Sequence, residues 1–115
     1  MTATIITVGN VSIRRTVFAN FKYEARMRQG DVVRVVYFGN RNISTFLDQH
    51  RNKTLKKTYY DANKWAINQA LNTGDLFSAP ILEWKILWNK PNLRESVEDY
   101  VDFIQNYGKT DTSTD

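Results

Sequence analysis

Hydrophobic and polar residues alternate over a long segment in the N-terminal part of the chain. From Val11 to Tyr23, apolar side chains occupy mostly odd positions and polar side chains lie between them. A period of two is typical of a strand with one buried face, so the pattern predicts a single strand over residues 11–23. A shorter apolar segment, residues 2–8, precedes it, and Gly9-Asn10 between the two is a typical hairpin turn. We therefore expect a β-hairpin here.

Two residues interrupt this alternation. Arg15 takes an apolar position and Phe18 a polar one, which indicates a β-bulge or a strand edge near them. Residues 24–31 are polar and contain a glycine, so we expect a flexible loop there. A third strand is predicted at Val32–Phe38, and the turn-forming residues 39–42 end it.

Helical spacing dominates the next part of the sequence. Apolar residues at steps of three and four predict an amphipathic helix that begins near Asp61 and ends at Gly74. A shorter helix is expected at 44–49. The same spacing over 93–107 predicts a last helix, with Asn92 as its N-cap and Gly108 as its stop.

Residues 82–88 return to strict alternation and predict a fourth strand, with Trp84 and Trp88 on its apolar face. The predicted order is β-β-β-α(-α)-β-α. This is an α+β fold, with a mainly antiparallel sheet of about four strands and two or three helices packed on one face. We expect one compact domain at 1–108 and a disordered tail at 109–115, which has no apolar residue. All three tryptophans, Trp65 included, are expected in the core.

Composition narrows the chemistry that the chain can perform. The 115 residues include no cysteine, which excludes disulfides, thiolate nucleophiles, zinc fingers and iron–sulfur clusters. A single histidine, His50, excludes two-histidine sites within one chain. No long apolar run or signal peptide occurs, so we expect a cytoplasmic protein that binds no membrane. We also expect that it needs no cofactor or metal. The size and the Asn- and Thr-rich composition are compatible with a phage or mobile-element accessory protein.

Charge is distributed unevenly along the chain. The formal net charge is +4, but residues 1–74 carry twelve Lys and Arg against four acids, whereas residues 75–115 carry four against eight. Aromatic residues, Phe18 and Phe38 among them, lie between the basic ones. Cations that neutralise phosphate and exposed rings that stack on bases suit single-stranded nucleic acid. We therefore expect a protein that binds nucleic acid, single-stranded or duplex. The expected nucleic-acid-binding residues are Arg14, Lys22, Arg34, Arg41, Arg51, Lys53, Lys56, Lys57, Lys64, Tyr59 and Tyr60, with Arg26 and Arg28 as further loop arginines.

Other interpretations remain open at this point. The basic residues are equally compatible with an ordinary solvated surface, because the sequence contains no RNP-type, KH or helix-turn-helix signature. A protein-binding inhibitor or adaptor is the alternative function, with Glu95, Glu98, Asp99 and Asp102 of the last helix as the docking residues. A magnesium-dependent nuclease built on Glu83, Lys85 and Asp75 is the third. We expect a binding protein rather than an enzyme, and the sequence leaves its oligomeric state open, a homodimer included.

Overall fold

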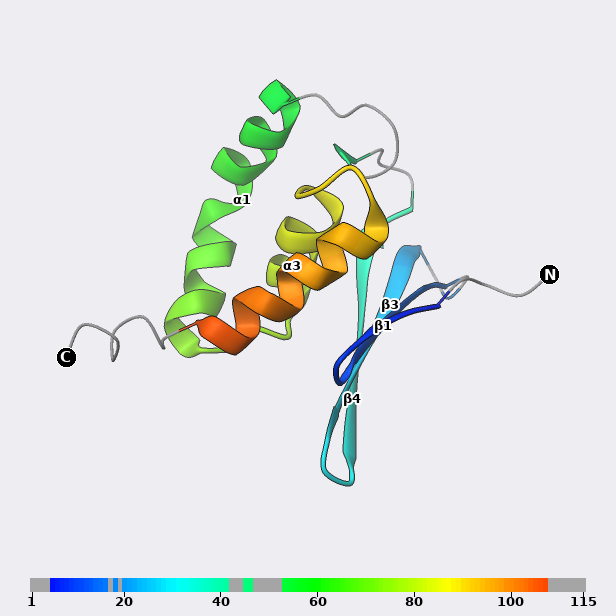
Figure 1. Ribbon diagram of the computed structural model, residues 1–115. Helices are drawn as coiled ribbons and strands as arrows, with labels where there is room; N and C mark the ends of the chain where they lie inside the picture. The colour runs from blue at the N-terminus through cyan, green and yellow to red at the C-terminus, as the bar shows by residue number, and fades with distance from the viewer. Residues whose placement is uncertain (1–4, 17, 19, 42–44, 47–52, 108–115) are drawn as a thin grey trace.

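A four-stranded antiparallel sheet carries a layer of helices on one of its two faces (Figure 1). The computed structural model describes residues 5–16, 18, 20–41, 45–46 and 53–107. The α+β class expected from the sequence is confirmed. The strands are β1 (Ile5–Val8), β2 (Val11–Arg15), β3 (Phe21–Gln29) and β4 (Val32–Asn40), and the helices are α1 (Lys53–Thr73), α2 (Ala79–Leu82), η2 (Glu83–Leu87) and α3 (Leu93–Asn106).

The sheet is a simple meander in the order β1-β2-β3-β4, so that β1 and β4 form its edges. The hairpin between β1 and β2 turns at Gly9-Asn10, as expected. Gly9 has φ +59°, a left-handed conformation that a residue without a Cβ adopts at little cost.

The single long strand predicted over 11–23 is wrong, because the chain turns in the middle of it. The Thr16 amide donates to the Lys22 carbonyl at 3.0 Å, and the Phe21 amide donates to the Phe18 carbonyl at 3.3 Å. Residues 11–15, which form β2, then pair with residues 23–27 of β3. A turn, not a bulge, thus accounts for the interrupted alternation.

The flexible loop predicted at 24–31 is also wrong, since β3 continues to Gln29. Only Gly30 and Asp31 form the turn, and Gly30 has φ +63°. Strand β4 begins at Val32 as expected and pairs with β3 along almost its whole length. The far half of this β3–β4 hairpin extends beyond the helical layer (Figure 1).

Helix α1 begins eight residues earlier than the sequence predicts and ends as expected, just before Gly74, which has φ +79°. The short helix expected at 44–49 falls largely outside the described residues.

The strand predicted at 82–88 is wrong, because this segment is helical. Pro80 lies in the first turn of α2, where the N–H that proline lacks would have no intrahelical partner. The Trp88 amide donates to the carbonyl of Glu83, five residues back, at 3.2 Å, so the chain continues as one π-helical turn. The buried side chains follow helical spacing: Ile81, Leu82, Ile86 and Leu87.

Helix α3 confirms the prediction for the last helix. The Asn92 side chain accepts from the Glu95 amide at 3.2 Å and caps it. The expected stop at Gly108 and the tail at 109–115 lie outside the described residues.

The core lies between the sheet and the helices. Tyr100 is fully buried there and donates to the carbonyl of Leu76 at 2.8 Å. Trp84 and Trp88 are half-buried, but the side chain of Trp65 is 73% exposed, so the prediction that Trp65 lies in the core is wrong. None of the described helices is long and apolar enough to cross a membrane.

Candidate functional site

The face of the sheet that points away from the helices, which we call the outer face, is not covered by any described helix (Figure 1). Residues paired across an antiparallel ladder share a face, so the strand register identifies the residues of the outer face. They form three rows: Ile5, Arg14, Glu24 and Tyr37; Thr7, Ser12, Arg26 and Val35; and Arg28 with Val33.

A buried carboxylate lies in the middle of the outer face. Glu24 is 4% exposed, accepts from Arg14 Nη2 at 3.3 Å, and also accepts from Arg26 Nε. Burial tends to raise the pKa of Glu24, but the hydrogen bonds and charges of Arg26 and Arg14 outweigh it, so the pKa lies below its usual value. Glu24 thus fixes two half-exposed guanidinium groups, each of which has further N–H donors beyond those that contact Glu24.

Hydroxyl and guanidinium groups surround two shallow hollows on the outer face. One, of about 280 Å³, is lined by Thr7, Ser12, Arg26 and Arg28 among others, and the two hydroxyl oxygens lie 3.1 Å apart. The other, of about 270 Å³, lies around Arg14 and Glu24. Hydroxyl and guanidinium groups are among the side-chain groups that bind phosphate oxygens.

Three aromatic rings gather at one end of the outer face. Tyr37 lies 4.9 Å from Phe18 and 5.8 Å from Phe21, measured between ring centroids, and the Phe18 side chain is 58% exposed. Arg41 fixes the turn that carries the two phenylalanines, because its Nη2 donates to the carbonyls of Thr16 and Phe21 at 2.7 and 2.8 Å. The expected stacking role of Phe18 fits this position.

Several residues expected on the nucleic-acid surface lie elsewhere. Lys22 is buried at 6% exposure, and Phe38 is fully buried in the core, so neither side chain is exposed to solvent as the sequence predicts. Arg34 belongs to the core-facing side of β4, where it is paired with Met27 across the ladder. Of the residues in and next to the strands that are expected to bind nucleic acid, Arg14 lies on the outer face, and Arg41 lies at one end of that face.

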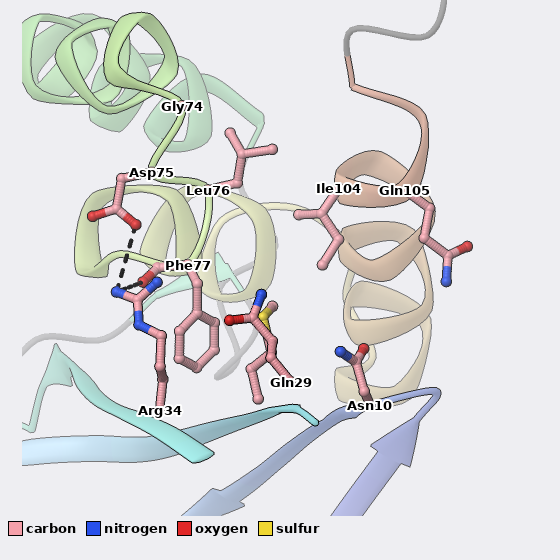
Figure 2. Close-up of a pocket in the computed structure, with 10 residues that line it drawn as sticks. Asn10, Gln29, Arg34, Gly74, Asp75, Leu76, Phe77, Ile104 and Gln105 are labelled. Carbon is pink, nitrogen blue, oxygen red and sulfur yellow. Dashed lines mark hydrogen bonds and ion pairs between the residues drawn. The ribbon is translucent and has the colours of Figure 1, made fainter. Parts of the chain in front are cut away.

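Arg34 lies at the rim of a hollow of about 420 Å³ between the β3–β4 hairpin and the helices (Figure 2). Its guanidinium lies 3.7 Å from the Asp75 carboxylate and 3.5 Å from the carbonyl of Phe77. The side-chain amides of Asn10 and Gln29 line the same hollow, which makes it polar and charge-balanced rather than basic.

Two of the α1 lysines that are expected to bind nucleic acid make contacts within the protein. Lys56 donates to the carbonyl of Asn89 at 2.7 Å, and burial together with nearby lysines lowers its pKa. Lys57 forms an ion pair with Asp61 at 2.8 Å. Lys53 and Lys64 are exposed, and Arg51 lies outside the described residues.

The two tyrosines of α1 are half-buried and make internal contacts. Tyr59 stacks on Trp88 with ring centroids 4.8 Å apart, and its hydroxyl lies 3.3 Å from Glu83 Oε1. Burial and the Glu83 carboxylate raise the pKa of Tyr59. Tyr60 lies 5.6 Å from the Trp84 ring. Helix α1 is part of the helical layer, so its lysines and tyrosines do not join the outer face in one surface (Figure 1).

Of the four acidic residues of α3 that are expected to dock a partner protein, three are exposed and one is partly buried. Glu95, Glu98 and Asp102 are exposed. Asp99 is partly buried, accepts from Asn89 Nδ2 at 2.6 Å, and lies 3.7 Å from Lys85 Nζ.

The strand geometry on which the nuclease hypothesis depends is not found. Glu83 and Lys85 lie on the π-helical turn, and Glu83 Oε2 accepts from the Gly39 amide at 3.1 Å. Asp75 pairs with Arg34 instead of standing beside Glu83 on a neighbouring strand. Within the described residues, no group of three or more acids and histidines is arranged to hold a metal ion.

Sequence reasoning missed the central strand of the outer face. Arg26 and Arg28 were expected in a loop, and Tyr37 was not expected in a site at all. The signal was present, because the even-numbered residues from Lys22 to Arg28 stay charged while Tyr23, Ala25 and Met27 stay apolar. Comparisons with protein families, with curated proteins and with solved structures gave no match for this chain.

Proposed function

We propose that the protein binds nucleic acid on the outer face of its sheet. The observation that carries the proposal is the juxtaposition of three arginines, Arg14, Arg26 and Arg28, with the exposed rings of Phe18 and Phe21 on a face that no described helix covers. The arginines supply donors for phosphate, and the rings supply surfaces on which bases stack.

Single-stranded nucleic acid fits this face better than a duplex. In a duplex the bases stack on one another, so exposed phenylalanine rings find no free base face. A single strand presents its bases, and each stacked base contributes about 1 to 3 kcal/mol. The arrangement of cations at the centre and rings at one end therefore favours a single nucleic-acid strand that runs across the outer face.

Glu24 reduces the net positive charge of the face but orders its arginines. Without the carboxylate, the long side chains of Arg14 and Arg26 would lose rotamer freedom on binding phosphate. With it, both guanidinium groups are held before the ligand arrives. Such preorganisation lowers the entropic cost of binding.

The direct test is fluorescence anisotropy of a labelled single-stranded oligonucleotide. Arg28→Ala should weaken binding several-fold and reduce the slope of log affinity against log salt by about one. Phe18→Ala should cost about 1 to 3 kcal/mol with little change in that slope. Lys64→Ala is the matched control, because Lys64 is an exposed cation of the helical layer.

Two results contradict the proposal. One is the absence of binding at low salt. The other is a loss of affinity with Lys64→Ala that equals the loss with Arg28→Ala, since that would place the ligand on α1.

A protein-binding inhibitor or adaptor is the second candidate, and one observation favours it. Trp65 is 73% exposed on α1, and large aromatic side chains are frequent anchors of protein interfaces. Capture of a binding partner that is abolished by Trp65→Ala, and unaffected by Arg28→Ala, would support this function over nucleic-acid binding.

A further inference from the structure

Strand β4 forms an exposed apolar edge of the sheet. Three of its valines remain largely accessible: Val32 is 60%, Val33 42% and Val35 40% exposed. Edge strands usually carry lysine, proline or inward-pointing charge that prevents pairing with another chain. The first five residues of β4 contain one charge, Arg34. It points to the core-facing side, but its guanidinium lies 3.7 Å from the Asp75 carboxylate, which compensates the charge.

The opposite edge of the sheet, β1, is shorter than β4 and is packed against a helix. Strand β1 has only four residues, and helix α3 packs against it. Strand β4 has nine residues, and its first half lies in the part of the hairpin that extends beyond the helical layer (Figure 1). Among the described strands, β4 has one neighbour, β3. Near the end of β4 the Gly39 amide already donates to Glu83 Oε2, so a further strand would pair with the residues before Gly39.

We propose that β4 pairs with β4 of a second copy of this chain, antiparallel and about a two-fold axis, to join the two sheets into one. The strand is self-complementary in this arrangement. With the axis at Val35, Val33 lies opposite Tyr37 of the other copy and Arg34 opposite Val36, so no two like charges face each other. Both outer faces then point the same way. The pairing does not depend on nucleic acid and is tested without it.

The test is the molar mass of the full chain by light scattering and sedimentation equilibrium over a wide concentration range. The mass should rise with concentration to twice the chain mass of 13.4 kDa. Val35→Lys should weaken the dimer about tenfold or more, because it sets two ammonium groups opposite each other. Ile5→Lys, which adds the same charge to the exposed side of β1, should leave the dimer unchanged.

A measurement on the unmodified protein covers the case in which Val35→Lys fails to fold. Backbone amides of residues 32–36 should exchange hydrogen more slowly at high than at low protein concentration. A chain that stays monomeric at every concentration overturns the proposal. Exchange in β4 that is independent of concentration, or a dimer that Trp65→Ala abolishes and Val35→Lys does not, overturns it as well.

Discussion

The Arg14 guanidinium donates to the carboxylate of Glu24, with Nη2 and Oε1 3.3 Å apart, across the ladder between β2 and β3. Glu24 is almost completely buried, and Arg26 donates to its second oxygen. A buried carboxylate that depends on two half-exposed arginines links the stability of the sheet to pH.

Glu24→Gln should therefore lower the free energy of unfolding at neutral pH by about 1 to 2 kcal/mol, because it removes the charge from these hydrogen bonds. The pKa of Glu24 is lower in the folded than in the unfolded protein, so its stabilisation is present above the unfolded pKa, near 4.5, and is lost as pH falls through the folded pKa. Urea unfolding between pH 7 and pH 2 measures this. Exposed Glu98 provides the control, since Glu98→Gln should leave the acid-side profile almost unchanged. Equal profiles for Glu24→Gln and the unmodified protein would contradict the assignment.

Gly39→Ala should destabilise the protein by about 2 kcal/mol or more. Gly39 has φ +85°, and a Cβ placed on it would lie 2.9 Å from Leu87 Cδ1 and 3.2 Å from Lys22 Cβ. Gly30→Ala is the control, because Gly30 also has a positive φ but no atom within 4 Å of the added Cβ. Thermal unfolding should show a clearly larger loss at position 39. Equal losses would mean that η2 does not pack against β4 at this point.

Tyr100→Phe should lower the free energy of unfolding by about 1 kcal/mol, because the carbonyl of Leu76 would lose a buried donor. The Tyr107 hydroxyl makes a longer and more exposed contact, 3.4 Å to the carbonyl of Leu71. Tyr107→Phe should thus change stability by less than about 0.5 kcal/mol. Denaturant unfolding of both variants separates the two cases, and a larger effect at position 107 would be inconsistent with the fold.

The tryptophans should respond differently to truncation. Trp84→Ala should cost about 3 kcal/mol, since Trp84 packs against Tyr60 and Phe103. Trp65→Ala should leave stability within about 0.5 kcal/mol. The comparison needs only thermal melts of the two variants, and a strongly destabilised Trp65→Ala would place that ring in the core after all.

Local patterns predicted the fold where nearby residues alone determine the backbone conformation. Residues 32–38 are almost all β-branched or aromatic, and Asn92 caps the helix that follows it, so the sequence was sufficient for β4 and α3. The strand predicted over 11–23 failed because β2 and β3 present alternating residues to the same two faces. A turn between two such strands can preserve the alternation along the sequence.

Residues 82–88 failed for a different reason. Their alternation fits a strand, but Ile81, Leu82, Ile86 and Leu87 also fit one face of a helix, and packing against the sheet and α3 selects the helix. The wrong strand boundaries also changed which residues belong to the candidate site. Its arginines could be named from sequence, but which of them share a face depends on strand boundaries that periodicity alone did not locate.

The most direct test of the proposed function is an NMR titration of the ¹⁵N-labelled protein with a short single-stranded oligonucleotide. The largest amide shifts should fall on the outer face, at Ser12, Arg26 and Arg28, and near the rings of Phe18 and Phe21. Shifts confined to α1 or α3, or no shifts at low salt, would contradict nucleic-acid binding by the outer face.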